Sequence, residues 1–328
     1  MDVKISVIMS VYNTKEEYLR VAIKSILSQT FKEYEFIIIN DCSNEKTSKI
    51  LEEYQDKRIV LIKNNTNLGL TASLNIGLAM AKGKYIARMD SDDISFHDRF
   101  ACQYYYMEQN PDIDILGGWV KIGKKINKSY GKAGNDWKKV RMLFENAGIC
   151  HPTAFIRKSF LDKYNLEYDG FMKKSQDYDL WCRCLEKGSI AVMPKLVLEY
   201  RVHDEQISIK DREEQNHYVN LIRKRELEKI YHGYTERELE QFLNMKREIL
   251  SAKELDAFWQ RILTNNREQG ILNDRILKYE FSKQWIRILL GMYKRRNKMH
   301  YLSIKWLSVL ISPCFWSFFI TNHILRRI

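Results

Sequence analysis

The sequence lacks the cysteine patterns of zinc sites and of disulfide-stabilised secreted domains. Its six cysteines are scattered through 328 residues, and none of them forms a Cys-x2-Cys pair. Common zinc sites need such closely spaced pairs, and secreted disulfide scaffolds need a far higher density of cysteine. We therefore expect reduced thiols in the protein interior, without a redox or metal role.

Two signals of nucleotide-using enzymes are absent as well. The sequence contains no Gly-x-Gly and no Gly-Lys-Ser or Gly-Lys-Thr. A dinucleotide-binding turn needs the first pattern so that the backbone can approach a pyrophosphate, and a P-loop needs the second to enclose the phosphates of a nucleoside triphosphate. Hydride transfer and P-loop hydrolysis are thereby disfavoured.

Acidic residues are missing from the C-terminal end of the chain. Residues 281–328 contain nine lysines or arginines and no aspartate or glutamate, although the whole chain has a net charge of +12. The other 280 residues hold 45 basic and 42 acidic residues, a net charge of only +3. The basic character belongs to one tail, and this distribution argues against nucleic acid as a partner.

The sequence also lacks an apolar run long enough to cross a bilayer. Residues 306–320 are strongly apolar, but they include Pro313 and fall short of the roughly 20 residues that a spanning helix needs. Flanking lysines and arginines, with Trp306 and Trp316, favour a helix lying on an anionic membrane surface. The alternative is a core helix with a solvated basic face. The N-terminus resembles the start of a strand and shows no secretory signal, so we expect a cytoplasmic protein at the cytoplasmic face of the cell membrane.

What is present is an alternation of short apolar runs with amphipathic stretches over the first hundred residues. Apolar, β-branched runs predict strands over residues 3–9, 34–39, 58–63 and 85–89, and helical spacing predicts helices over 16–27 and 70–81. Such alternation is typical of an α/β fold with a mostly parallel sheet flanked by helices.

The pattern changes along the rest of the chain. We expect a helix over 97–110 with Ser95 and Asp98 as its capping pair, a strand over 113–122, a loop over 127–136, strands over 154–156 and 190–193, and a helix over 177–185. Beyond Asp211 the sequence indicates charged helices only, one of them opened by a Thr235-x-x-Glu238 capping box. We place a domain boundary at about residue 210.

Polar side chains follow three of the predicted strands. Asn13 comes after the first strand, Asn40-Asp41 after the second, and Asp90-Ser91-Asp92-Asp93 after the fourth. Ligands of open α/β sheets bind at the carboxyl ends of the strands, so these groups should meet in one crevice.

The acidic cluster suggests a metal site. Asp90, Asp92 and Asp93 fall within four residues, where their carboxylates repel one another unless a cation neutralises them. All-oxygen ligation favours Mg²⁺ or Mn²⁺, either of which also holds a diphosphate. A solvated acidic turn is the alternative at this stage.

Two further segments fit a nucleotide. Asp41 is suited to accept the imide N–H of a uracil, and Tyr12 to stack on the same base, although such residues at strand ends often only start turns. The segment from Asn67 to Gly77 opens a helix with a glycine-bearing turn, whose N–H groups suit a phosphate.

Together these segments resemble the family 2 inverting glycosyltransferases with the GT-A fold, of the type that assembles bacterial capsules and surface polysaccharides. The resemblance covers roughly residues 3–205 and rests on four stretches in order: Ser6-Val7-Ile8-Met9-Ser10-Val11-Tyr12-Asn13, Ile39-Asn40-Asp41-Cys42-Ser43, Asn67 to Gly77, and Ala81-Lys82-Gly83-Lys84-Tyr85-Ile86-Ala87-Arg88-Met89-Asp90-Ser91-Asp92-Asp93. It implies a GT-A catalytic domain over 1–210, with a nucleotide-sugar-binding half (1–95) and an acceptor-side half (96–210). A helical region (211–300) and a basic amphipathic tail (301–328) follow.

The resemblance also implies roles for individual residues. Asp90 and Asp92 match the family's Asp-x-Asp and, with His203 of the Tyr200-Arg201-Val202-His203 segment, would hold Mn²⁺ or Mg²⁺; a phosphate contact is the other role open to His203. The family usually has Asp-Asp-Gly-Ser where this chain has Asn40-Asp41-Cys42-Ser43, which leaves the turn after Asp41 in question. The residues expected to contact the nucleotide-sugar donor are Val11, Tyr12, Asn13, Asp41, Asn67, Gly69, Asn75, Asp90, Ser91 and Arg201.

The catalytic base of the family is the aspartate of a Glu-Asp pair that opens a helix. Here the pair is Gln176-Asp177, so the resemblance gives the role of proton acceptor to Asp177, while Asp179 is read as structural. The implied function is transfer of a sugar from a nucleotide-diphosphate sugar, a UDP-sugar by expectation, to a glycan or lipid-linked acceptor. The alternatives are an inactive, membrane-associated GT-A-like binding protein and a sugar-phosphate nucleotidyltransferase; Val11-Tyr12-Asn13-Thr14-Lys15-Glu16 lacks the glycine-rich basic loop of the latter.

Overall fold

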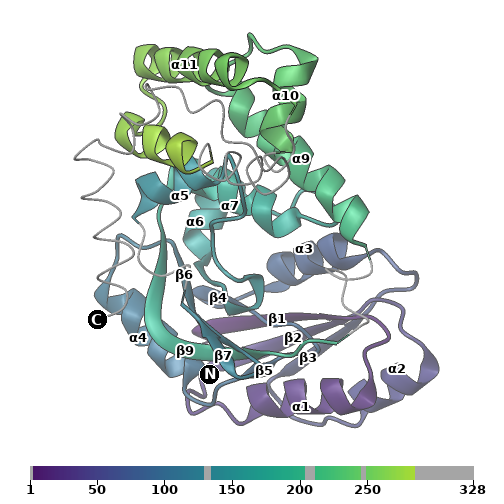
Figure 1. The fold of residues 1–328 in the computed structure, drawn as a ribbon. Coiled ribbons are helices and arrows are strands. Elements are labelled where there is room, and N and C mark those ends of the chain that lie inside the picture. The colour runs from purple at the N-terminus through teal and green to yellow at the C-terminus, as the bar shows by residue number, and fades with distance from the viewer. Residues whose placement is uncertain (1–2, 129–133, 204–210, 245–248, 285–328) are drawn as a thin grey trace. The chain divides into compact units, whose positions relative to one another are not determined.

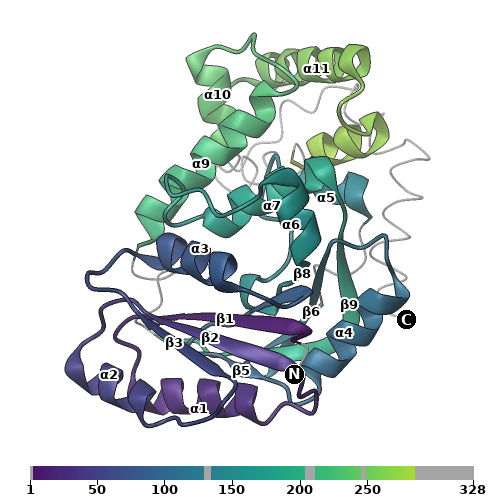
Figure 2. The same ribbon diagram turned by 180° about the vertical axis from the view of Figure 1, so that it is seen from behind.

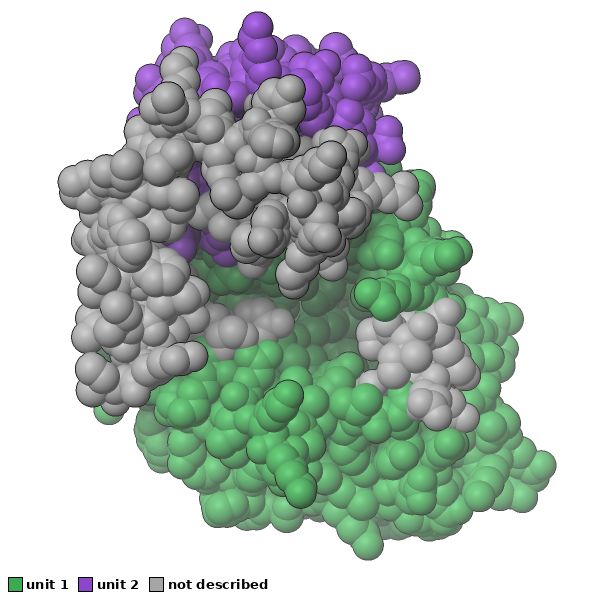
Figure 3. Space-filling model, in the orientation of Figure 1, with its two compact units in different colours: residues 1–222 green, residues 223–328 purple. Residues whose placement is uncertain are grey.

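A computed structural model of the chain describes residues 3–128, 134–203, 211–244 and 249–284. The chain divides into two compact units, residues 1–222 and residues 223–328, which Figure 3 shows in separate colours. The first unit is the α/β part and contains the candidate site.

A single mixed sheet forms the centre of the first unit. In the described residues its nine strands run in the order β3-β2-β1-β4-β8-β6-β9-β5, with β7 paired to β6. The strands are β1 (Ile5–Val11), β2 (Tyr34–Asn40), β3 (Ile59–Lys63), β4 (Tyr85–Arg88), β5 (Ile94–Ser95), β6 (Ile115–Ile122), β7 (Lys125–Asn127), β8 (Phe155–Arg157) and β9 (Ile190–Tyr200). β3, β2, β1 and β4 are mutually parallel, as expected, whereas β8 pairs antiparallel with both β4 and β6.

Helices cover both faces of this sheet (Figures 1 and 2). One face packs against α1 (Glu16–Leu27), α2 (Glu45–Glu52) and α4 (Arg99–Gln109), and the other against α3 (Leu70–Met80), α6 (Lys158–Tyr164) and α7 (Gln176–Lys187). Because it is covered on both sides, β2 is buried along its whole length, which is why its sequence is almost continuously apolar. The predicted α/β fold is confirmed.

Strand β9 is longer than its sequence predicts. The predicted strand ends at residue 193, and the next residue, Pro194, lacks an N–H for a sheet hydrogen bond. In the structure the register shifts twice here: Gly118 pairs with Met193, Trp119 with Leu196 and Val120 with Leu198, and regular pairing then resumes. The continuation to Tyr200 is what brings the end of β9 to the candidate site.

Two short strands were not predicted, and one predicted helix cap was wrong. Residues 94–95 and 125–127 form the strands β5 and β7, of which β7 reaches only the first residue of the predicted loop, and two or three residues are too few to show a period. The expected capping pair of Ser95 and Asp98 does not form: α4 has no side-chain cap, Ser95 is buried in β5, and Asp98 pairs with Lys195.

The second unit is helical. α9 (Arg212–Glu228) runs through the division between the units, and α10 (Glu236–Leu243) and α11 (Ala252–Gln269) follow. The predicted capping box of Thr235 and Glu238 is present, and Ser251 and Glu254 form another. No helix in the described part of the chain is both long and apolar enough to cross a membrane. The predicted tail, residues 301–328, lies outside the described residues.

Candidate active site

The ends of β1 and β2 are joined by backbone and side-chain hydrogen bonds. The Asp41 N–H donates to the Val11 carbonyl at 2.9 Å, and the Asn13 side chain accepts from the Asn44 N–H at 2.7 Å. Asn13 and Cys42 both have positive φ, 50° and 58°. Cys42 thus keeps the left-handed conformation for which glycine is preferred, so the cysteine at this position leaves the turn intact.

Asp41 organises the turn that precedes α3. Its carboxylate accepts hydrogen bonds from the Leu68 and Gly69 N–H groups at 2.9 and 2.8 Å and from the Asn64 amide at 2.7 Å. Asn67 donates to the Asp41 carbonyl at 3.2 Å. The amides expected to face a phosphate at Leu68 and Gly69 therefore bond to Asp41, which is only 1% exposed.

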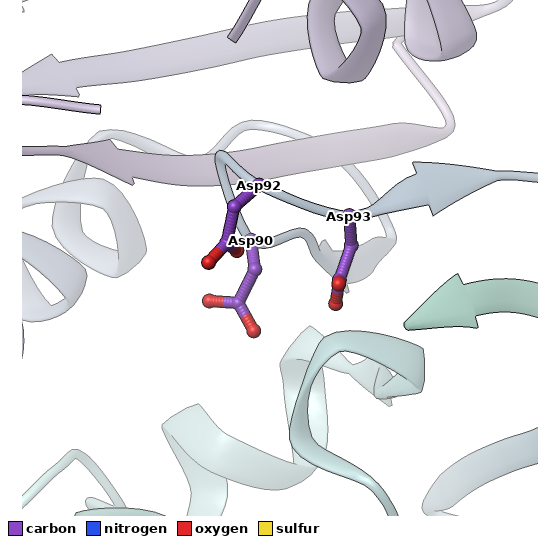
Figure 4. Close-up of side chains that lie close together, drawn as sticks. All are labelled: Asp90, Asp92 and Asp93. Carbon is purple, nitrogen blue, oxygen red and sulfur yellow. The ribbon is translucent and has the colours of Figure 1, made fainter. Parts of the chain in front are cut away.

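The acidic cluster lies on the turn between β4 and β5. Figure 4 shows the side chains of Asp90, Asp92 and Asp93 projecting to the same side of this turn, and their carboxylate oxygens lie within 4.8 Å of one another. Ser91, between them, shares a hydrogen bond of 2.7 Å with Thr14 after β1. Asp93 is fully buried, while Asp90 and Asp92 keep partial access to solvent.

Pairing of β5 with β9 adds Arg201 and His203 to the acidic turn. Ile94 pairs with Glu199 in antiparallel register, so the register continues with Asp92 opposite Arg201. The His203 ring nitrogen Nε2 lies 2.8 Å from Oδ2 of Asp92, and the Arg201 N–H donates to Asp93 at 3.0 Å. The structure therefore joins the two predicted segments, which lie far apart in sequence.

Tyr18 of α1 supports both of these basic side chains. The His203 ring stacks on Tyr18 with centroids 4.8 Å apart, and the Arg201 guanidinium lies 4.7 Å from the centre of the same ring. Arg201 also donates to the carbonyls of Tyr18 and Asp92. The Arg201 guanidinium thus links the acidic turn to α1. The donor contact that the family resemblance implies for Arg201 stays a prediction.

Burial and mutual repulsion shift the protonation of the acidic turn. Burial, with the charges of Asp90 and Asp92, raises the pKa of Asp93 to about 9. Burial and Asp90 also raise the pKa of Asp92, while its contact with His203 lowers it. Arg88, the last residue of β4, forms an ion pair with Asp90. A bound cation would reverse these shifts, because it favours the ionised carboxylates.

The acidic turn suits Mg²⁺ or Mn²⁺. Oxygen ligands of Mg²⁺ lie about 2.0–2.1 Å from the ion, so two of them on opposite sides are roughly 4 Å apart. The observed separations, within 4.8 Å, are close to this spacing. Asp90 and Asp92, the pair that the family resemblance implies as ligands, are the carboxylates of the turn with partial solvent access.

Asp177 lies in the first turn of α7. Its Oδ2 accepts a hydrogen bond of 3.0 Å from the Asn146 side-chain amide. Burial raises the pKa of Asp177, hydrogen bonds from the Tyr178 N–H and from Asn146 oppose this, and the charge of Asp90 raises it further. A carboxyl group whose pKa is displaced upward in this way is suited to proton transfer.

Two residues discussed in the sequence analysis, Asp179 and Asn75, hydrogen-bond to other parts of the protein. Asp179 is fully buried and accepts hydrogen bonds of 2.8 and 2.7 Å from the Arg183 guanidinium, contacts that fit the structural role expected of it. Asn75 of α3 exchanges hydrogen bonds with the Tyr168 backbone, 2.8 Å to its carbonyl and 3.0 Å from its N–H. Asn75 thereby fixes the chain that leads into α7. Tyr12, by contrast, is 55% exposed, as a side chain available for stacking should be.

Sequence reasoning gave no role to Arg88, Tyr18 or Asn146. Arg88 lies within a quoted motif, but an arginine in an apolar strand is not by itself a signal. Tyr18 and Asn146 come close to the site residues only in the folded protein. Asn146 lies 31 positions before Asp177 and belongs to none of the motifs named above. Only the three-dimensional arrangement identifies them.

A family model for "Glycosyl transferase family 2" matches residues 6–164. An uncharacterized glycosyltransferase of Methanocaldococcus jannaschii is 37% identical over 239 residues, which cover 70% of this chain and 77% of the relative. The Escherichia coli O-antigen biosynthesis glycosyltransferase WbnJ is 34% identical, with 61% of this chain and 80% of the relative covered.

Another E. coli relative carries a more detailed name. The UDP-Glc:alpha-D-GlcNAc-diphosphoundecaprenol beta-1,3-glucosyltransferase WfaP is 30% identical over 67% of this chain and 83% of its own length. The crystal structure of S. aureus TarS in complex with UDP-GlcNAc superposes with a TM-score of 0.63 at 18% identity, covering 92% of this chain and 94% of that chain. That likeness supports the fold. The family match and the length of the shared sequence lead to one conclusion: this chain belongs to glycosyl transferase family 2.

Proposed function

We propose that the protein is a metal-dependent, inverting glycosyltransferase that uses a UDP-sugar as donor. The observation that carries the proposal is the proximity of two functional groups from distant parts of the chain. The acidic turn lies close enough to Asp177 for the charge of Asp90 to raise the pKa of Asp177. A donor diphosphate at the acidic turn would therefore present its sugar toward a carboxyl group that can accept a proton.

In this proposal the nucleotide occupies the carboxyl ends of β1, β2 and β4. Exposed Tyr12 stacks on the base, and the turn that Asp41 holds through Leu68 and Gly69 forms the wall beside it. A single position on the Asp41 carboxylate is left for a uracil N–H, since a carboxylate accepts about four hydrogen bonds and three are in use. UDP and UDP-GlcNAc in the crystal structures of TarS support a uridine nucleotide.

Asp90 and Asp92 would hold the divalent cation, with His203 orienting Asp92 through their 2.8 Å contact. The cation, when bound, supplies positive charge that stabilises the leaving diphosphate. Arg201 holds the acidic turn against β9 and α1, so that the two carboxylates keep their places as the charge changes. Loss of such an orienting partner typically costs about 10- to 100-fold in metal affinity.

The transfer is a single displacement. The acceptor hydroxyl oxygen forms a bond to the anomeric carbon as the bond from that carbon to the diphosphate oxygen breaks, and the nucleoside diphosphate leaves with the electron pair. The hydroxyl proton passes to the Asp177 carboxylate. Attack opposite the leaving group inverts the anomeric configuration. A positioned base of this kind contributes about 10²- to 10⁴-fold to the rate.

The acceptor in this proposal is a glycan or a lipid-linked oligosaccharide at the cytoplasmic face of the cell membrane. WfaP, as its name states, glucosylates a GlcNAc-diphosphoundecaprenol, and WbnJ acts in O-antigen biosynthesis. The basic, tryptophan-containing tail of residues 301–328 suits such a location. Cosedimentation with vesicles containing anionic lipid tests it: binding should fall when the tail is removed, and equal binding would refute this part of the proposal.

The function is tested by release of nucleoside diphosphate from a panel of sugar nucleotides, with and without Mn²⁺ or Mg²⁺. We expect metal-dependent release from at least one UDP-sugar, faster when a suitable acceptor is added. The panel should include GDP- and dTDP-sugars as matched controls for the base. Absence of metal-dependent release with every donor would contradict the proposal.

A further inference from the structure

The proposed base Asp177 is held by a side chain from another part of the chain. Asn146 lies in the segment between α5 (Asn135–Arg141) and the short 3-10 helix His151–Thr153. Its Nδ2 donates to Oδ2 of Asp177 at 3.0 Å, and its Oδ1 accepts the Gly148 N–H at 3.3 Å. The second bond fixes which end of the amide faces Asp177, because only the nitrogen end can donate.

The segment that contains Asn146 is itself fixed against α7. The Tyr178 hydroxyl donates to the Met142 carbonyl, and Ala147 and Ile149 are buried. At Gly148 an added Cβ would lie 2.5 Å from the Trp181 ring, so only glycine allows the backbone to come this close. Asn146 is therefore presented to Asp177 from a rigid support, which is what precise orientation of a reacting group requires.

The residue that precedes the proposed base leaves its side-chain oxygen without a hydrogen bond among the described residues. Family members have a glutamate before the catalytic aspartate, whereas here Gln176 occupies that position. Gln176 is only 6% exposed, and its Oε1 has no hydrogen-bond partner among the described residues. Within the same described part of the chain, Asn146 supplies the side-chain hydrogen bond to Asp177.

We infer that Asn146 is a positioning residue for proton transfer in this chain, one that orients the Asp177 carboxylate and favours its ionised form. The inference rests on the proposed role of Asp177 as base. An amide that donates to a carboxylate stabilises the anion and offers nothing to the protonated acid at that oxygen. The hydrogen bond therefore keeps the carboxylate available as an acceptor in spite of its burial.

Among the described residues, Asp90, Cys150 and Tyr168 are the other titratable groups that interact with Asp177. Asp90 of the acidic turn raises the pKa of Asp177, and the charge of Asp177 in turn raises the pKa of Cys150 before the 3-10 helix and of Tyr168 before α7. Against these, hydrogen bonds from the Tyr178 N–H, from the Asn146 side chain and from the N–H of Asp177 itself lower the pKa of Asp177. Loss of Asn146 should therefore move the titration of the base upward.

The experiment compares Asn146→Ala and Asn146→Asp with the parent enzyme. For Asn146→Ala we expect kcat to fall roughly ten- to a hundredfold, the usual range for a hydrogen bond to a charged group, with the KM for donor within about twofold. The acidic limb of the kcat/KM profile should move to higher pH, and further in Asn146→Asp, where a second carboxylate faces the base. Asn110→Ala, which removes an amide bonded to the Tyr106 carbonyl at 2.8 Å, is the matched control and should leave both quantities unchanged.

The outcomes separate the inference from the function on which it rests. If Asn146 acts through Asp177, Asn146→Ala should cause no additional loss in an Asp177→Asn background. A lower thermal midpoint with an unmoved pH profile would show that Asn146 is merely structural and would overturn the inference alone. Full activity of Asp177→Asn would overturn the proposed base as well.

Discussion

His203 and Asp92, 111 positions apart in the sequence, meet at 2.8 Å through Nε2 and Oδ2. Two features of the fold make this contact. Antiparallel pairing of β5 with β9 aligns the acidic turn with the end of β9, and Tyr18 supports the His203 ring from α1. The contact joins the acidic turn to the segment that follows β9. If the acidic turn holds a cation as proposed, we expect this contact to influence metal affinity.

Replacement of Asp92 should weaken metal-dependent donor binding. In Asp92→Asn the amide has one neutral oxygen in place of a carboxylate, so we expect the metal concentration at half-maximal activity to rise at least about 100-fold. Titration of activity with Mn²⁺ measures this. Exposed Asp112, also an aspartate but outside the site, gives the matched control Asp112→Asn. Equal metal requirement in the two variants would remove Asp92 from the site.

Replacement of His203 should weaken the metal site without eliminating it. His203→Gln keeps a hydrogen-bonding group but loses the ring that stacks on Tyr18. An orienting partner of a ligand contributes about 10- to 100-fold to metal affinity, so the Mn²⁺ requirement should rise by that factor, with kcat at saturating Mn²⁺ largely retained. A loss that saturating metal does not restore would assign His203 a different role.

The raised pKa of Asp177 predicts an acid-sensitive reaction and a stability effect of opposite sign. Transfer needs the ionised carboxylate, so kcat/KM should rise with pH through a value above the ordinary aspartate pKa of about 4. Burial favours the protonated form, so the same group stabilises the fold below about pH 4 and this contribution is lost as pH rises through the folded-state pKa.

Asp177→Asn separates these two effects. Transfer should fall about 10²- to 10⁴-fold while donor binding is retained, because the residue acts on the acceptor. The free energy of unfolding, from urea titrations between pH 4 and 8, should decrease less with pH than in the parent protein. A variant that lost both transfer and donor binding would not fit the role of a base.

Gly83 lies where the turn before β4 crosses β1. An added Cβ there would be 2.5 Å from the Ser6 nitrogen and 2.7 Å from the Ile5 carbonyl carbon, both backbone atoms that cannot rotate away. Gly83→Ala should therefore lower the free energy of unfolding by about 1–3 kcal/mol. At exposed Gly170 an added Cβ meets nothing within 4 Å, so Gly170→Ala should stay within about 0.5 kcal/mol of the parent. Similar free energies of unfolding for the two variants would contradict the close approach of Gly83 to the backbone of Ile5 and Ser6.

The sequence predicted those parts of the site that are local in the chain. Asp90 and Asp92 share one turn, and Asp41 directly follows a buried strand, so strand-end position alone pointed to them. The metal-site role of His203 and the role of Asp177 as base were implied by the family resemblance, because no local pattern links residues so far apart.

The remainder depended on tertiary structure. β5 is two residues long and has no period to detect, yet it fixes the register that brings Arg201 to Asp93. Asn146 is an ordinary polar residue in an irregular segment, and its meaning comes from the approach of Gly148 to Trp181. The bulge at Pro194 likewise arises from pairing between strands, which a single stretch of sequence does not encode.

The most direct test is a calorimetric titration of UDP into the parent protein and into Asp92→Asn, each with and without Mn²⁺. We expect UDP to bind the parent protein in the presence of Mn²⁺, and to bind at least about tenfold more weakly when either the metal or the Asp92 carboxylate is removed. Equal affinity for UDP in all four titrations would contradict the assignment of the acidic turn as the site that holds the donor diphosphate through a cation.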